Sequence, residues 1–486
     1  MLPIAMFSQT SNQQDFEERR RQMQQEFENF KAQNTRDFEN FRAETNAKFA
    51  EFMGRSWERF NASQGIPVPK SPEPEKPPVA DPEKRLTSQP LPLEKITPQP
   101  APTPRAQPLI QPLPPTPHQT PSTETYAFLF YNTNCYVNLD NSLRFSLPNA
   151  TEKMVAQTWK TLSNERYDAL LSSCLTLREQ LNLSDWGYFQ MLKTFSESFF
   201  GEESDEAVLL QMYILTQSGY KVRIARTDGR LALLIPFKEP IYAYSFLNID
   251  GMKYYIVNKV LQRQSFHVFN HEFPKEQYFS WQTGLPNFSV NLNPPKPFVS
   301  KNSEINGVVQ TNQNLIDFFN DHPQSDSEFY VHMGLSETVK QTLYPTLRNA
   351  IAGQSKFRAA EILLDFCQTA FDYQTCAEQF GHERPFFLDE NFFFPYNNCK
   401  HRATLYAFLV KDLLNLDVVL LHYPARLSPN GIGHLATAVH FPEFVNGDYF
   451  TIEGKNFVVC DPTYIGASIG MTMDKYKQIR AEIIRL

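Results

Sequence analysis

The 486-residue sequence has no apolar run long enough to cross a lipid bilayer, so no transmembrane segment is expected. It has no basic patch with interleaved aromatics, and a formal net charge of -7 gives little support to nucleic-acid binding. Its cysteines and histidines show no paired metal-ligand spacing such as C-x-x-C or H-E-x-x-H. We therefore predict neither a metal nor a cofactor.

Cysteine is scarce, with six residues in the whole chain. Apart from Cys399, which is treated below, they are Cys135, Cys174, Cys367, Cys376 and Cys460. This odd remainder argues against a disulfide framework, although one bridge such as Cys367 to Cys376 is compatible with an exported protein. Cys367 on a helical stripe and Cys460 on an alternating strand are interpreted as core residues.

The N-terminal segment MLPIAMFSQ is apolar up to Phe7 and then becomes polar. Residues 1–10 resemble the end of a secretory signal whose basic start and most of whose apolar core are missing. A frayed terminus is the alternative. The first interpretation predicts a periplasmic or secreted protein, and a complete N-terminus predicts a cytoplasmic one.

Phenylalanine recurs every eleven residues near the N-terminus, at Phe16, Phe27, Phe38, Phe49 and Phe60. Eleven residues make about three helical turns, so these side chains form one narrow apolar stripe on a helix predicted over residues 11–62. Such a stripe needs a partner surface. The repeat therefore predicts self-association, or binding to a partner helix, through residues 16–60, in a straight or slightly right-handed bundle.

Proline dominates the next segment, residues 63–122, in stretches such as PVPKSPEPEKPP. Few apolar residues lie between the prolines, so burial cannot offset the entropy lost on ordering. We expect a disordered, extended spacer that holds the following units away from the helix.

From residue 123 onward the sequence predicts an α+β fold, and it matches itself. A polar start, an amphipathic helix and β-branched strands recur in the same order in two places. The aligned segments are residues 203–226 with 399–423, 229–237 with 433–441, and 246–258 with 450–461. We predict two copies of one domain, at residues 123–265 and 305–486, joined by a connecting segment at 266–304.

The two copies differ at three chemically distinctive positions. The second has Cys399, His434 and Asp461, whereas the first has Glu203 (or Ser204), Arg230 and Asn258. The apolar frame around these positions is the same in both copies. The pattern indicates one working site and one that no longer carries its reactive groups.

Cys399 precedes a helical stripe that begins at Ala403, and Asn398 is a plausible N-cap for that helix. A helix N-terminus, or an imidazole that takes the proton, turns a thiol into a strong nucleophile. A small cysteine packed at a helix start is the alternative.

His434 and His440 share one face of the alternating segment GHLATAVHF. A hairpin closed by Asn446-Gly447 would set His434 opposite Asp461, where the carboxylate can orient the ring. A second turn signal at Glu453-Gly454 allows a three-stranded meander instead, in which His440 lies nearer to Asp461.

The second copy resembles the core of the transglutaminase-like superfamily, relatives of papain-type cysteine enzymes. Three segments carry the resemblance, in this order: NNCKHRATLYAFLVKDLLNLDVVLL, GIGHLATAVHF and FVVCDPTY. It implies a helix bearing the cysteine, packed on an antiparallel sheet bearing the histidine and the aspartate. It also implies Cys399 as nucleophile, His434, rather than His440, as general base and acid, and Asp461 as the residue that orients the histidine.

The reaction implied by the resemblance is acyl transfer from an amide of a protein or peptide through a thioester. Water as acceptor makes a peptidase or amidase, and an amine makes a transamidase. The oxyanion hole is expected at the backbone N–H of Cys399, with Tyr396 as a candidate for the upstream donor.

One departure from the family pattern is the run Lys400-His401-Arg402, where members commonly carry an acidic residue two after the nucleophile. These cationic side chains either lower the pKa of the thiol or mark a site no longer in use. In the second case the protein is a non-catalytic, oligomeric binding scaffold, which is the alternative function.

Overall fold

A computed structural model describes residues 7–69, 76–84, 86–98, 106–108, 125–258, 265–280, 284–302, 305–428 and 431–486. The side chains of residues 7–17, 165, 327 and 328 are not part of this description. The predicted α+β class is confirmed, since a six-stranded barrel and a second, curled six-stranded sheet are both covered by helices. Of the predicted signal remnant, residues 1–6 lie outside the description and residues 7–10 belong to a helix.

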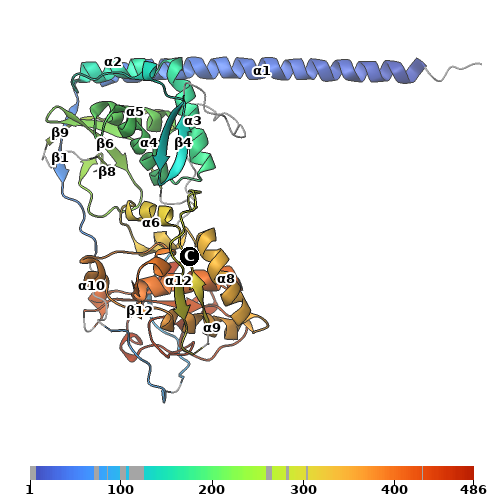
Figure 1. Cartoon of the computed structure of the whole chain (residues 1–486), viewed down its shortest axis with the longest axis vertical. Helices are drawn as coiled ribbons and strands as arrows, with labels where there is room; N and C mark the ends of the chain where they lie inside the picture. Colours follow the sequence, from blue (N-terminus) through green and yellow to red (C-terminus); the bar gives the residue numbers. More distant parts are fainter. Residues whose placement is uncertain are drawn as a thin grey trace, which may run out of the picture.

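The N-terminal helix α1 spans Phe7–Met53 and projects far beyond the rest of the chain (Figure 1). The side chains of residues 18–41 are all exposed. Its last turns lie against α2, where the buried Phe49 packs on Trp159. Arg42 pairs with Asp168, the first residue of α3, at 2.6 Å. The long helix is confirmed, but its predicted end at residue 62 is wrong.

The helix ends at Met53 because the chain beyond it pairs with a sheet. Phe60, the last phenylalanine of the repeat, lies on the strand β1 (Glu58–Ser63) opposite Phe266. Its side chain packs against the inner apolar cluster of the barrel. Long-range strand pairing therefore overrides the helical period at this point.

The first sheet is a closed barrel in the order β1, β7, β8, β6, β5, β9. All its pairings are antiparallel, and β1 closes it by pairing with both β7 and β9. The other strands are β5 Arg223–Thr227, β6 Arg230–Pro236, β7 Phe246–Ile249, β8 Met252–Ile256 and β9 Ser265–Phe269.

Helices and one hairpin cover this barrel and enclose the larger of the apolar cores. They are α2 Glu152–Leu162, α3 Asp168–Gln180, α4 Asp185–Phe200, α5 Asp205–Gln217, and the hairpin strands β3 Tyr126–Phe130 and β4 Thr133–Val137. Figure 1 shows this barrel unit above the C-terminal unit.

The second sheet has the order β16, β17, β15, β14, β18, β2, with only the β18–β2 pair parallel. Its strands are β14 Val418–Tyr423, β15 His434–Val439, β16 Tyr449–Ile452, β17 Lys455–Cys460, β18 Ala481–Arg485 and β2 Leu93–Thr97. Because no strand joins β2 to β16, this sheet curls without closing.

Helices of the C-terminal half pack around α12 (Cys399–Leu414), which lies across β14 and β15. They are α7 Ser327–Val331, α8 Glu337–Ile351, α9 Lys356–Thr369, α10 Cys376–Phe380 and α11 Glu390–Phe393. The helix α6 (Gln313–Asn320) packs instead in the core of the barrel unit. Short strand pairs complete the unit: β10 Lys296–Val299 with β11 Asn306–Val309, and β12 Asp372–Tyr373 with β13 Tyr396–Asn397.

The segments aligned in the sequence occupy equivalent places in the two sheets. In each unit a helix is followed by four strands that pair in the same order, α5 with β5 to β8 and α12 with β14 to β17. The register agrees as well, since Leu234 faces Ile256 in one unit as Ala438 faces Val459 in the other. Common ancestry of the two units stays a prediction.

The described residues between β1 and β2 form a segment that we call the strap, and it runs down the outside from the barrel unit to the C-terminal unit (Figure 1). Ile66 forms a bridge with Tyr242, Val79 with Ile465, and Pro90 with Tyr449. The disordered spacer predicted at residues 63–122 is therefore wrong for the described part. Proline presets an extended backbone. This backbone forms single bridges to loops at Tyr242 and Ile465, and it meets the edges of the second sheet at Tyr449 and, as β2, along β18.

The structure also differs from the predicted boundaries of the connecting segment and of the C-terminal copy. The strand β9 belongs to the barrel and not to the connecting segment predicted at 266–304. The helix α6, placed in the C-terminal copy at 305–486, buries Phe318 and Phe319 in the core of the barrel unit. Among the described residues no helix has both the length and the apolar character that crossing a membrane requires.

We predict that Phe49→Ala lowers the free energy of unfolding by about 3–5 kcal/mol, because it removes a buried ring that lies 4.9 Å from both Trp159 and Phe269. Urea denaturation followed by tryptophan fluorescence measures the loss. The matched control is Phe444→Ala, since the ring of Phe444 is 87% exposed. Equal losses for the two variants would contradict the packing of α1 on the barrel unit.

Candidate active site

Cys399 is the first residue of α12, and Asn398 caps that helix as predicted. The side-chain oxygen of Asn398 accepts hydrogen bonds from the backbone N–H groups of Lys400 and His401, at 3.0 and 3.2 Å. The imidazole of His401 in turn accepts the N–H of Asn398 and completes a capping box. The sulfur of Cys399 is therefore held at the N-terminus of a sixteen-residue helix, the end that stabilises negative charge.

The three side chains that follow Cys399 lie in different surroundings. Lys400 pairs with Glu383. Burial lowers the pKa of His401 to about 3, so its ring is neutral, and it stacks on Phe386 with ring centroids 3.5 Å apart. Arg402 is buried one helical turn beyond Cys399.

Arg402 is the cation whose charge acts on the thiol of Cys399. Its guanidinium donates to the carbonyl oxygens of Gln368 and Phe371, at 2.9 and 2.6 Å, at the C-terminal end of α9. Burial lowers the pKa of Arg402 to about 10, and negative charge on Tyr373, Cys367 and Cys399 opposes this shift. The guanidinium thus stays charged at neutral pH and favours a thiolate at Cys399.

His434 and Asp461 meet in a buried hydrogen bond, with 2.8 Å between Nε2 and Oδ2. The other carboxylate oxygen of Asp461 accepts the backbone N–H groups of Thr463 and Tyr464, which fixes its orientation. The direct antiparallel pairing of β15 with β17 agrees with the hairpin alternative, but Thr437 lies opposite Cys460 instead of in a register that sets His434 opposite Asp461. The turn at Glu453-Gly454 joins β16 to β17, and β17 then lies directly beside β15.

His440, the alternative base, lies away from this pair. Its Nδ1 is 3.0 Å from the backbone oxygen of Asn456, and its backbone N–H donates to Asp417. Of the two histidines, His434 is the one in contact with Asp461.

Two tyrosines that the sequence analysis did not single out hold the imidazole of His434 from one side. Tyr476, in the short helix η4 (Asp474–Tyr476), stacks on the ring at 5.1 Å with an interplanar angle of 10°. Tyr423, opposite His434 on the neighbouring strand, stacks on both rings, 6.2 Å from His434 and 4.7 Å from Tyr476. Burial raises the pKa of Tyr476, and nearby negative charge on Cys399 and Asp461 raises it further. Tyr476 therefore lies close to all three predicted site residues.

The barrel unit shows what occupies the equivalent place there. Its helix α5 is capped by Ser204, so the residue that matches Cys399 is Asp205, not Glu203 or Ser204. Arg230, at the position of His434, lies 3.0 Å from Asp205. An ion pair thus joins the start of the helix to the start of the neighbouring strand. Asn258, at the position of Asp461, bonds to the backbone of Leu231 and Leu233.

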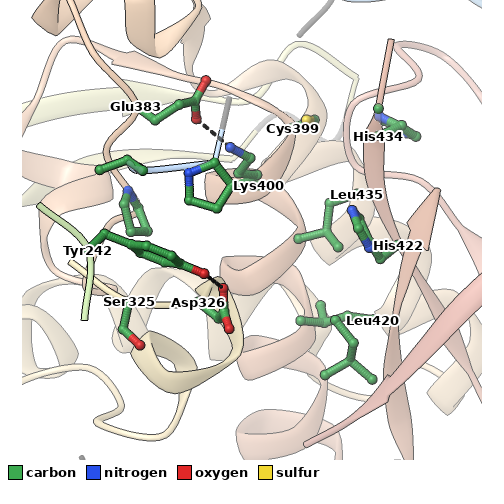
Figure 2. Close-up of a pocket in the computed structure, with 15 residues that line it drawn as sticks. Tyr242, Ser325, Asp326, Glu383, Cys399, Lys400, Leu420, His422, His434 and Leu435 are labelled. Atoms are coloured by element: carbon green, nitrogen blue, oxygen red, sulfur yellow. Dashed lines mark hydrogen bonds and ion pairs between the residues drawn. The ribbon is translucent and has the colours of Figure 1, made fainter. Parts of the chain in front are cut away.

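A cavity opens beside Cys399 and His434, and Figure 2 shows both residues at one end of it. The residues that line it are Val68, Pro69, Tyr242, Ser325, Asp326, Glu383, Pro385, Cys399, Lys400, Leu420, His422, Gly433, His434, Leu435 and Ile484. His422 also lines this cavity, where it contacts Glu482 at 2.9 Å.

Tyr396, the candidate for the upstream oxyanion donor, lies outside the lining of the cavity. Its side chain is 36% exposed. Its backbone N–H donates to Gln379 at 3.3 Å. The interpretation of Tyr396 as upstream donor therefore has no geometric support.

A second cysteine, Cys376, lies 3.9 Å from Nε2 of His401. That nitrogen contacts the backbone oxygen of Arg384 at 2.9 Å, while Nδ1 accepts from Asn398, so Nε2 carries the ring proton. An imidazole in this tautomer has no nitrogen left to take a proton from the thiol. The pair is structural.

The other cysteines are buried and free, and the bridge considered between Cys367 and Cys376 is not formed. Burial raises the pKa of Cys135 and of Cys460 to about 12, which makes both thiols poor nucleophiles. Within the described residues no three His, Cys, Asp or Glu side chains are grouped in a way that could hold a metal ion.

Comparisons with protein-family models, with curated proteins and with solved structures find no match for this chain. The likeness to the transglutaminase-like superfamily therefore stays a resemblance of motifs. Its interpretation depends on the geometry of the site alone.

We predict that His401→Gln reduces the loss of stability on acidification. The native ring, with a pKa of about 3, stays unprotonated, whereas the unfolded ring takes up a proton below about pH 6.5. Native stability is therefore lost as the pH falls below about 6.5, by about 1.4 kcal/mol per pH unit for this residue. Glutamine can keep the capping box but cannot titrate.

Urea denaturation of wild type and His401→Gln at about pH 8, 6 and 5 measures the effect. The difference in the free energy of unfolding between the two proteins at about pH 8 measures the lost stacking on Phe386. The change of this difference with pH measures the contribution of protonating His401 in the unfolded chain. A difference that does not vary with pH would show that the ring titrates normally in the folded chain.

Proposed function

We propose that this protein is a cysteine enzyme of the transglutaminase-like type that acts on amide bonds of a protein or peptide through a thioester. The observation that carries the proposal is the buried hydrogen bond between His434 and Asp461. His434 lines one cavity together with Cys399, which is the first residue of α12. A cysteine, a histidine and a carboxylate in this arrangement are the parts that nucleophilic acyl transfer requires.

Asp461 sets the tautomer of the histidine. Because its carboxylate accepts the hydrogen bond, Nε2 of His434 carries a proton and Nδ1 is left as the basic nitrogen. Nδ1 takes the proton of the Cys399 thiol. The resulting imidazolium is stabilised by Asp461, and the thiolate is stabilised by the N-terminus of α12 and by Arg402.

The thiolate then attacks the carbonyl carbon of the amide, and the carbonyl electron pair moves to the oxygen. When the tetrahedral intermediate collapses, the C–N bond breaks and His434 gives its proton to the departing amine. A thioester of Cys399 is left. Water, or an amine, attacks this thioester while His434 takes a proton from it, and the thiol is released with an acid or a new amide as product.

The arrangement in the barrel unit supports the same geometry. There Arg230 contacts Asp205 directly, so the equivalent positions in the C-terminal unit, His434 and Cys399, lie at facing ends of a strand and a helix. An ion pair of Asp205 with Arg230 keeps the contact between helix and strand, but it provides neither a nucleophile nor a base. On this proposal only the C-terminal unit is catalytic.

We predict that iodoacetamide labels Cys399 at least about tenfold faster than Cys135 or Cys460, because these two thiols have pKa values of about 12. Mass spectrometry of the alkylated peptides over time measures the rates. His434→Ala and Asp461→Asn should each slow the labelling of Cys399 about tenfold or more.

The matched control is His440→Ala, which removes the alternative histidine and should leave the rate at Cys399 unchanged. Circular dichroism of each variant separates loss of chemistry from loss of fold. Slow and uniform labelling of all six cysteines in the wild type would sink the proposal in favour of a non-catalytic scaffold.

A second candidate function, oligomeric display of the globular units, is favoured by the exposed part of α1. Its stripe includes Phe27 and Phe30, 63% and 64% exposed, and Phe38 and Phe41, 41% and 45% exposed. The same stripe continues into Phe49, which is buried against the barrel unit. The exposed stripe thus extends an apolar interface that already exists.

We infer that a second copy of α1 covers this stripe. Each phenylalanine ring gains about 1.5–3 kcal/mol when it is fully buried, so covering the stripe is favourable. Two identical helices share the eleven-residue period, so their rings stay in contact along the whole stripe of a straight or slightly right-handed bundle. A partner helix of another protein is the alternative occupant.

We predict that the full chain sediments as a dimer or larger assembly at micromolar concentration, and that the double variant Phe27→Glu/Phe30→Glu sediments as a monomer. The control, Gln25→Glu/Asn29→Glu, adds the same charge on the opposite face of the helix and should keep the assembly. A wild-type chain that is monomeric in analytical ultracentrifugation would overturn the inference of a second copy.

A further inference from the structure

The cavity beside Cys399 is assembled from three parts of the chain that are far apart in the sequence. The strap supplies Val68 and Pro69, and the barrel unit supplies Tyr242. The C-terminal half supplies the rest, including Leu420 and Ile484. Figure 2 shows Cys399 and His434 at one end of the cavity, and Tyr242, Ser325 and Asp326 across from them.

The size of the cavity limits what it can hold. The cavity has a volume of about 170 Å³, below the range of about 300–1,000 Å³ that is usual for pockets that enclose a whole small molecule. This space suits one side chain of a substrate whose main chain lies outside.

The polar residues that line the cavity are already paired with other protein groups. Tyr242 donates from its hydroxyl to Asp326 at 2.6 Å, and Ser325 donates to the backbone oxygen of Pro240 at 2.8 Å. Lys400 pairs with Glu383, and His422 contacts Glu482. A charged substrate group would therefore have to compete with existing partners.

The remaining lining is apolar and comes from both sides of the cavity. It consists of Val68, Pro69, Pro385, Leu420, Leu435 and Ile484. Burial of an apolar side chain here gains the hydrophobic free energy without breaking any of the ion pairs or hydrogen bonds named above.

We propose that this cavity is the specificity pocket of the enzyme and that it binds an apolar side chain of the acyl group transferred to Cys399. The inference rests on the proposed function, because it places the scissile carbonyl at the Cys399 end of the cavity. It also assigns a role to the barrel unit and the strap. Without Val68, Pro69 and Tyr242 the pocket would lack one of its walls.

Alkylation of Cys399 in the full chain by three iodoacetamides tests the pocket. The probes are iodoacetamide itself, N-benzyl-2-iodoacetamide and N-(4-aminobutyl)-2-iodoacetamide, each corrected for its rate with glutathione as a free thiol. We expect the benzyl probe to react with Cys399 about tenfold faster than iodoacetamide, because its ring is buried in the cavity. The aminobutyl probe should gain no such advantage.

Val68→Asp tests the contribution of the strap. It places a charge on the apolar wall, and it should lower the ratio of the benzyl rate to the iodoacetamide rate several-fold. Val79→Asp is the matched control, because Val79 lies on the same strap, is 73% exposed and is not among the residues that line the cavity. It should keep the wild-type ratio.

Three results would overturn the inference: no advantage for the benzyl probe, a greater advantage for the aminobutyl probe, or equal ratios for Val68→Asp and Val79→Asp. They differ from failure of the proposed function. In that case iodoacetamide itself would show no preference for Cys399 over Cys135 or Cys460.

Discussion

The hydrogen bond between His434 and Asp461 is the contact around which the C-terminal unit is organised. It forms only if β17 lies beside β15 in the observed register, and if the loop after β17 turns back to donate two N–H groups to the carboxylate. Gln368 of α9 holds this loop through the backbone oxygens of Asp461, Tyr464 and Ala467. The site therefore depends on the sheet and on the helices alike.

The cation beside Cys399 follows from the same packing. Arg402 is buried because α12 is covered by α9, and the carbonyl oxygens at the end of α9 solvate its charge. A guanidinium whose hydrogen bonds go to carbonyl oxygens is costly to bury, and such a cost is expected where the charge has a task. Of the three residues after Cys399, His401 is neutral and Lys400 pairs with Glu383, so only Arg402 combines a retained charge with burial near Cys399.

The two sheets have the same arrangement of strands but different residues at equivalent positions. Both units share the order and register of their strands, but β1 closes the first sheet into a barrel while the second stays open. In the barrel unit an ion pair of Arg230 with Asp205 occupies the positions that His434 and Cys399 have in the C-terminal unit. The strap then joins the units, and it reaches the cavity of the second with Val68 and Pro69. The N-terminal half is thus part of the surroundings of the site.

Local sequence patterns predicted several elements that carry the candidate site. The start of α12 at Cys399, the cap at Asn398 and the alternation of β15 are set by neighbouring residues, as is the turn at Glu453-Gly454, so they can be read from short stretches of sequence. The long helix could be predicted for the same reason. Its end could not, because Phe60 leaves the helical stripe for a strand whose partners are some two hundred residues away.

Thus the sequence by itself determined the class of the fold, the internal correspondence of the two halves, and the three residues to be tested as a triad. The tertiary structure alone decided that His434, rather than His440, contacts Asp461, and that Tyr476 stacks on its ring. It also decided that a proline-rich segment is bound along both units instead of being free. These outcomes depend on pairing and burial between distant segments, which no local pattern encodes.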